Sequence, residues 1–178
     1  MSCRLTRLIV GNTVQFMKRF ALGLLAMLLS ISVMSPADAA SKTVKGGLGQ
    51  SLSAAQTLVK SGDFVTVSGN HFDETVGIYL GYCVVPKKGA PPTPCGGGVN
   101  KSGTGEASFW ISSNPPPYGV GLAEEFLPGG RFTKKLKISK MIGRFNCTKV
   151  RCAITVRADH LRSEDRSYDL FIPITVRK

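Results

Sequence analysis

Histidine is nearly absent from this chain: two of its 178 residues are His, and one is Trp. Two histidines leave little scope for metal sites or acid–base chemistry built on imidazole. The five cysteines show no CxxC-type spacing, which argues against a zinc site, and no glycine-rich phosphate loop precedes a helical pattern. We therefore expect no metal and no cofactor, and we predict that the protein is not an enzyme.

Long apolar runs are also scarce, and the one that exists lies near the N-terminus. It covers 20–34, follows a basic pair and precedes small residues that end at Ala39. This pattern predicts a secretory signal peptide over 1–39 and a single mature domain over 40–178, with Met17 as an alternative start. A membrane anchor is the other interpretation, but 15 residues at about 1.5 Å each fall short of a ~30 Å hydrocarbon core. We expect a secreted protein with no membrane anchor after cleavage.

Four cysteines remain in the predicted mature chain: Cys83, Cys95, Cys147 and Cys152. In an exported protein, four cysteines indicate two disulfides. Three pairings are possible, and the one that joins neighbours in the sequence closes the shortest loops. Four of the 23 basic residues and one of the 11 acidic residues lie in the predicted leader, so the mature chain carries a net charge of +9.

The rest of the pattern is that of an all-β protein. Apolar and polar residues alternate, or β-branched residues cluster, in several short segments bounded by Gly, Pro and Asn; these are 64–68, 76–83, 107–111, 132–138, 152–156 and 170–176. An irregular first strand is expected within 51–59. Two segments without strand character, 85–98 and 112–130, predict long loops, and loops of that length are often binding loops. Short strands separated by Gly/Pro turns favour a sandwich or a barrel.

The order of strands and cysteines resembles the neocarzinostatin family, the apoproteins of actinobacterial chromoproteins, and related exported actinobacterial domains. The resemblance rests on the SGDFVTVSG run at 61–69, a strand that ends at Cys83, the next cysteine at Cys95, and a late cysteine pair before a strand. It implies a seven-stranded, immunoglobulin-like Greek-key sandwich with the local disulfides Cys83–Cys95 and Cys147–Cys152. In the chromoproteins a cleft beside the disulfide loops holds an aromatic enediyne. Here Val85 replaces an aromatic residue and four prolines remake the first loop, so a different ligand is expected.

Four aromatic residues near the first disulfide are candidates for lining such a cleft: Tyr79, Tyr82, Trp110 and Tyr118. Their rings would stack on a ligand and bury apolar area. Ordinary core packing is the competing interpretation, above all for Tyr82 and Trp110. His160 lies in a charged stretch between two strands, which is typical of a solvated hairpin rather than of an active site.

Charge is the strongest unusual feature, because 126–158 contains no acidic residue. Its nine basic residues are Arg131, Lys134, Lys135, Lys137, Lys140, Arg144, Lys149, Arg151 and Arg157. The set serves solubility, or it attracts anionic polymers of the cell envelope. Nucleic acid is a poor candidate partner, since few aromatic residues are interleaved.

The leading hypothesis is a non-enzymatic binding module with a small aromatic or apolar ligand in a cleft near the first disulfide. The alternative is a structural or adhesive envelope protein held to wall polymers by its basic surface. Haem capture is a third, weaker hypothesis. The sequence does not predict an oligomeric state.

Overall fold

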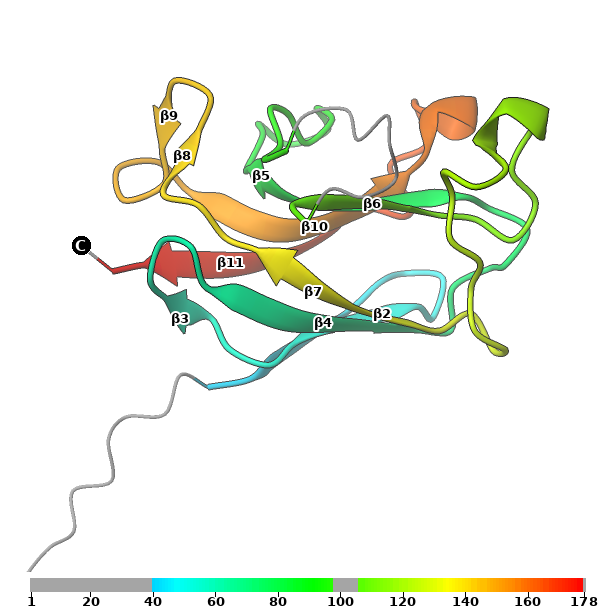
Figure 1. The fold of residues 1–178 in the computed structure, drawn as a ribbon, viewed down its shortest axis with the longest axis horizontal. Coiled ribbons are helices and arrows are strands. Elements are labelled where there is room, and N and C mark those ends of the chain that lie inside the picture. Colours follow the sequence, from blue (N-terminus) through cyan, green and yellow to red (C-terminus); the bar gives the residue numbers. More distant parts are fainter. Residues whose placement is uncertain (1–39, 98–105, 178) are drawn as a thin grey trace, which may run out of the picture. The chain divides into compact units, whose positions relative to one another are not determined.

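Residues 40–97 and 106–177 are described by the computed structural model of the chain (Figure 1). The predicted signal peptide, the alternative start at Met17 and the last residue of the 85–98 loop lie outside the described residues. Among the described residues there is no helix with the length and apolar character needed to cross a membrane.

Eleven strands and two short 3-10 helices make up the described chain. The strands are β1 (Lys42–Lys45), β2 (Ser51–Ala54), β3 (Leu58–Val59), β4 (Phe64–Asn70), β5 (Ile78–Val84), β6 (Ser108–Ile111), β7 (Phe132–Lys137), β8 (Met141–Ile142), β9 (Phe145–Asn146), β10 (Cys152–Ala158) and β11 (Leu170–Val176). The 3-10 helices are η1 (Pro117–Gly119) and η2 (His160–Arg162).

The strands form two facing sheets and a separate hairpin. One sheet has the order β1-β2-β4-β7, the other has the order β3-β11-β10-β5-β6, and β8 pairs with β9 alone. All pairs are antiparallel except β3 with β11. Figure 1 shows β4 and β7 in the lower layer, and β5, β6 and β10 in the upper layer.

Alternation along each strand builds the core between these layers. Every second residue of β4 and β2 is buried, as are Leu136 of β7 and the facing residues of β5, β10 and β11. Ile78, Leu80, Ile154 and Ile172 are fully buried in this apolar cluster. The predicted all-β sandwich and both predicted disulfides, Cys83–Cys95 and Cys147–Cys152, are confirmed.

The predicted count of seven strands is wrong, because the described chain has eleven. Four extra strands have four residues or fewer: β1, β3, β8 and β9. The segment 51–59 holds two strands rather than one. Its first part, β2, pairs with β1 and β4, whereas β3 pairs with β11 of the other sheet. The chain therefore crosses between the layers at this point, which interrupts the alternation.

Candidate functional site

The floor of the candidate site is the outer face of the five-stranded sheet, where β5 lies between β6 and β10. On β5, residues 78, 80 and 82 face the core, so Tyr79, Gly81 and Cys83 face outward. Tyr79 lies opposite Trp110 on β6 and opposite Arg157 on β10. This register places three large side chains in one row across the sheet.

The next row of the floor has small side chains. Gly81 lies opposite Ser108 on one side and Thr155 on the other. A Cβ built on Gly81 would find its nearest neighbour, Cys83 Sγ, at 3.5 Å, which is ordinary contact. A small side chain would therefore fit at Gly81, and its absence leaves the floor open at this row.

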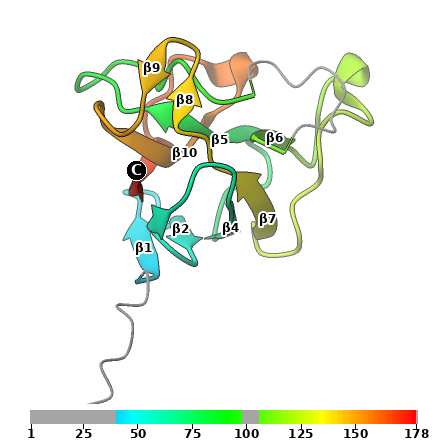
Figure 2. The same ribbon diagram turned by 60° about the vertical axis from the view of Figure 1, so that its left-hand side comes forward.

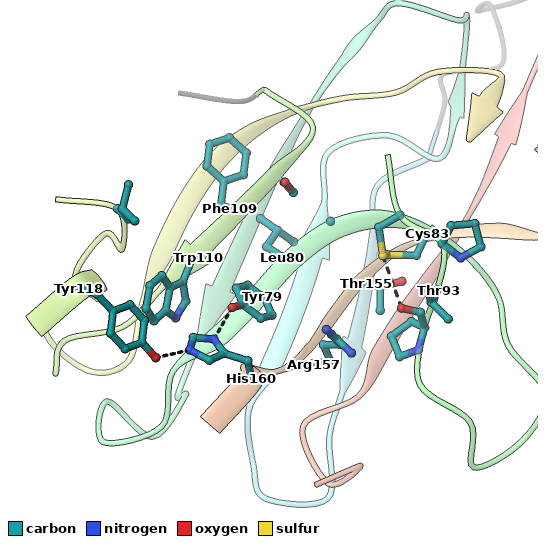
Figure 3. A pocket seen from close by; sticks show the side chains of 16 residues that line it. Tyr79, Leu80, Cys83, Thr93, Phe109, Trp110, Tyr118, Thr155, Arg157 and His160 are labelled. Carbon is teal, nitrogen blue, oxygen red and sulfur yellow. Dashed lines mark hydrogen bonds between the residues drawn. A yellow bond between two sulfur atoms is a disulfide. The ribbon is translucent and has the colours of Figure 1, made fainter. Parts of the chain in front are cut away.

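Two walls rise from this floor and enclose a cavity of about 910 Å³ (Figure 3). One wall is the 92–95 segment, which is held against β5 by the Cys83–Cys95 disulfide. Two backbone hydrogen bonds also hold it there, one from Val84 N to Pro94 O and one from Gly96 N to Tyr82 O. The other wall includes Tyr118 and Leu122 from the 112–130 loop, together with His160. Phe109 also contributes to the apolar lining.

His160 joins two tyrosines at the rim of the cavity. Its Nδ1 and the Tyr79 hydroxyl share a hydrogen bond of 2.5 Å, and its Nε2 and the Tyr118 hydroxyl share one of 2.7 Å (Figure 3). In a neutral imidazole one nitrogen donates and the other accepts, so one tyrosine donates to the ring and the other accepts from it. The Trp110 ring meets the His160 ring edge-on, with centroids 5.1 Å apart. These rings form one aromatic cluster drawn from four separate segments.

Asp159 positions two parts of this cluster through its hydrogen bonds. Its side chain is 1% exposed; Oδ2 accepts from Trp110 Nε1 at 3.0 Å, and Oδ1 accepts from Leu161 N at 3.0 Å. The second bond caps η2, the turn that presents His160. Gly77 allows the close approach, since a Cβ there would lie 2.0 Å from Asp159 Oδ2. One buried carboxylate thus fixes both the indole and the histidine turn.

Electrostatics at the site are set by Arg157 and by burial. The Arg157 guanidinium carbon lies 5.5 Å from the centre of the Tyr79 ring, a cation–π arrangement. Burial, followed by the negative charge of Asp159, raises the pKa of Tyr79, and Arg157 opposes this rise. The hydroxyl of Tyr79 therefore stays protonated at neutral pH and remains available for hydrogen bonding.

Three of the four aromatic candidates line the cavity: Tyr79, Trp110 and Tyr118. The fourth assignment is wrong. Tyr82 is 1% exposed and, by the alternation of β5, points into the core, where burial raises the pKa of its hydroxyl. Among the residues that the structure describes, this hydroxyl has no hydrogen-bond partner. Along β5, the even-numbered residues face the core and the odd-numbered ones face outward. This alternation separates Tyr82 from Tyr79.

Sequence reasoning missed the role of three residues at the cavity: Phe109, Arg157 and His160. The sequence pattern groups Arg157 with the basic residues of 126–158, and it predicts a solvated hairpin around His160. His160 is exposed and does lie in a turn between strands, but its ring closes one end of the cavity. Its partners are 81 and 42 residues away in sequence, and no local pattern predicts contacts of that range.

The nine basic residues lie in different environments. Lys134 pairs with Glu124 and lies over the Phe109 ring, and Lys137 pairs with Glu106 at 3.1 Å. Lys135 and Lys137 face outward from β7, while Arg157 lines the cavity. The members that are exposed are Arg131, Lys135, Lys137, Lys140, Arg144, Lys149 and Arg151. Over 40–97 and 106–177, no group of three or more His, Cys, Asp or Glu side chains could hold a metal ion.

Comparison with known proteins gives one structural match. No protein-family model matches the chain, and no curated protein matches its sequence. The solved structure of macromomycin matches 72% of this chain and 99% of its own, with a TM-score of 0.46 and 16% sequence identity. Macromomycin is a chromoprotein of the neocarzinostatin family, which the sequence resembles. At this identity and TM-score the match assigns neither a ligand nor a residue role to this chain.

Proposed function

We propose that the protein is an exported, non-enzymatic binding module that holds a small, planar, largely apolar molecule in the cavity beside the Cys83–Cys95 loop. The observation that carries this proposal is the cavity itself. Its volume of about 910 Å³ lies in the range typical of small-molecule sites, and aromatic and apolar side chains dominate its lining.

The construction of the cavity supports a binding role. The floor is rigid sheet, one wall is tied down by a disulfide, and the rim is fixed by the Tyr79–His160–Tyr118 hydrogen bonds. A site that is already formed before binding loses little conformational entropy when a ligand enters. Both ring nitrogens of His160 are engaged by tyrosines, so this histidine serves the architecture of the rim. Two disulfides are typical of a protein that works in an oxidising compartment outside the cytoplasm.

Filling the floor at Gly81 tests the proposal. We expect the mature protein to bind the neutral probe N-phenyl-1-naphthylamine, detected by energy transfer from Trp110, the single tryptophan and part of the cavity lining. Gly81→Leu should weaken this binding at least about tenfold, because the side chain occupies the space above the sheet. Gly81→Ala is the matched control and should bind within a few-fold of the parent protein, since a Cβ meets only ordinary contacts.

Two results would contradict the binding-module proposal. One is a parent protein that binds no small aromatic probe. The other is a folded Gly81→Leu protein, judged by its circular dichroism, that binds the probe as tightly as the parent does.

A second candidate function, adhesion to an anionic envelope polymer, is favoured by one local feature. Lys140 and Arg144 flank β8, and Lys149 and Arg151 both lie in the loop closed by Cys147–Cys152. All four are exposed, and none forms an ion pair with any residue that the structure describes. We call these four residues the hairpin basic cluster. Cys147 N donates to Lys140 O at 2.8 Å, so the hairpin and the disulfide loop are joined at their base.

A further inference from the structure

The charged group that lines the cavity is unusual for an apolar site. Arg157 projects from β10 onto the outer face of the sheet, is only partly exposed, and carries the one permanent charge among the described lining residues. A partly buried guanidinium beside aromatic rings loses hydration that a surface arginine keeps. In proteins such a cation is normally compensated by a carboxylate.

No carboxylate of the described chain forms an ion pair with Arg157, although its charge acts on Asp169 and lowers the pKa of that carboxyl against the rise that burial causes. The ion pairs there involve Lys134, Lys137 and Arg166 instead. The two carboxylates near Arg157 have other partners, although Asp169 Oδ1 has no hydrogen-bond partner among the described residues. Asp159 accepts from Trp110 and from a backbone N–H, and Asp169 pairs with Arg166 at 3.1 Å. The Tyr79 ring is the contact that the guanidinium does make.

The register of the sheet places Arg157 where a ligand substituent would lie. Arg157 and Thr155 are two residues apart on the same face of β10, and they lie opposite Tyr79 and Gly81 of β5. A planar body lying over Gly81 therefore has Thr155 at its β10-facing edge, and Arg157 follows at the next outward position of β10. In the view of Figure 3, Arg157 lies between the Tyr79–His160 pair and Thr93.

We propose that the natural ligand is an aromatic carboxylate, with its ring system over Gly81 and its carboxylate on the Arg157 guanidinium. This proposal rests on the proposed binding function and adds the charge class of the ligand. A guanidinium presents paired N–H donors that match the two oxygens of a carboxylate, and such charge-assisted bonds are stronger than neutral ones. The anion would supply a direct ion-pair partner, which no described residue provides.

A matched pair of ligands tests the charge class directly. The probes are 2-naphthoate and its neutral analogue 2-naphthamide, which have the same ring system and nearly the same size. The readout for each is the quenching of Trp110 fluorescence in the mature protein. We expect 2-naphthoate to bind at least about tenfold more tightly than 2-naphthamide, in keeping with the strength of hydrogen bonds to charged groups.

Two variants with the same change in net charge assign this preference to Arg157. Arg157→Gln should bring the two dissociation constants within about twofold of each other, and its circular dichroism should match that of the parent protein, which shows that the variant is folded. Arg151→Gln removes a charge from an exposed residue just before β10 and should keep the full preference. Arg157→Met, which retains most of the aliphatic stem, should behave as Arg157→Gln does.

The outcomes separate this proposal from the binding function beneath it. If the parent protein binds both probes equally, or if Arg157→Gln and Arg157→Met keep the preference for the anion, the carboxylate proposal is wrong while the binding module stands. If the parent protein binds neither these probes nor the neutral naphthylamine, the binding function fails as well. Loss of the preference in Arg151→Gln would trace it to overall charge and would also overturn the proposal.

Discussion

At the residue scale, two glycines of the same chain segment do opposite things for the cavity. Gly81 leaves space, because a Cβ there would find only ordinary contacts. Gly77 permits a close approach, because a Cβ there would overlap Asp159 Oδ2 at 2.0 Å. The first glycine can be replaced by alanine without strain, whereas the second holds a buried carboxylate in the position from which it binds Trp110 and caps η2.

Replacing Gly77 should therefore damage both stability and the site. We expect Gly77→Ala to lower the free energy of unfolding by about 2–4 kcal/mol, because the displaced Asp159 leaves buried groups without their hydrogen bonds. The emission of Trp110 should shift as its N–H loses its partner. Urea unfolding followed by this fluorescence measures both effects. Gly47→Ala is the control, since a Cβ at Gly47 meets nothing within 4 Å; equal stabilities of the two variants would contradict this account.

At the element scale, the two disulfides close loops of similar kind but have different consequences. Cys83 and Cys95 line the cavity and fix its 92–95 wall to β5, whereas Cys147–Cys152 lies at the start of β10 outside the cavity lining. Their sequence separations are 12 and 5 residues. Loop-closure entropy then gives contributions of about 3 kcal/mol for the first and about 2 kcal/mol for the second.

Removing each disulfide in turn should separate stability from binding. Cys83→Ala with Cys95→Ala should cost about 3 kcal/mol and also weaken N-phenyl-1-naphthylamine binding at least about tenfold, because the wall is no longer anchored. Cys147→Ala with Cys152→Ala should cost about 2 kcal/mol and leave binding within a few-fold. Urea unfolding and probe titration give the two readouts. Equal losses of binding in both variants would show that the cavity responds to global stability rather than to its wall.

Elements with one face in the core were predictable, and short elements were not. The expected strands at 64–68 and 170–176 correspond to β4 and β11, since burial of one face imposes alternation along them. The expected strand at 107–111 corresponds to β6. The two-residue strands β3, β8 and β9 are too short to show a period. They exist because tertiary contacts bring partners to them, and this information is not local in the sequence.

The residues that line the cavity were only partly predictable from the sequence. The disulfide loop and the ring-bearing strand were placed correctly beside each other, as the bridge from Cys83 to Cys95 requires. Which side of β5 a ring occupies depends on parity, and this separates Tyr79 from Tyr82. The contribution of His160 depends on where the 112–130 loop and η2 meet in space, and neither segment has a periodic pattern that would have predicted it.

At the scale of the whole molecule, the positive charge of the 126–158 region divides into groups with different environments. Lys134 and Lys137 are paired with glutamates, and Arg157 lines the cavity. Arg131 and Lys135 are exposed on and before β7. The hairpin basic cluster is the exposed group of four on the β8–β9 hairpin and the adjoining disulfide loop; Figure 2 shows this hairpin beside β10 and away from β1 and β2. A polyanion would therefore be held at this end of the five-stranded sheet rather than along β7.

Neutralising the hairpin basic cluster should decide whether it is an adhesive surface. We expect the fourfold variant Lys140→Gln, Arg144→Gln, Lys149→Gln and Arg151→Gln to elute from an immobilised phosphate-bearing wall polymer at clearly lower salt than the parent protein. The reason is that a protein with fewer basic contacts releases fewer counterions when it binds, so its binding is weaker and is lost at lower salt. The matched control neutralises four exposed lysines elsewhere, Lys42, Lys45, Lys60 and Lys87, with the same change in net charge. If both variants elute at the same salt, retention follows net charge alone, the cluster is a solubility feature, and the envelope-adhesion function is wrong.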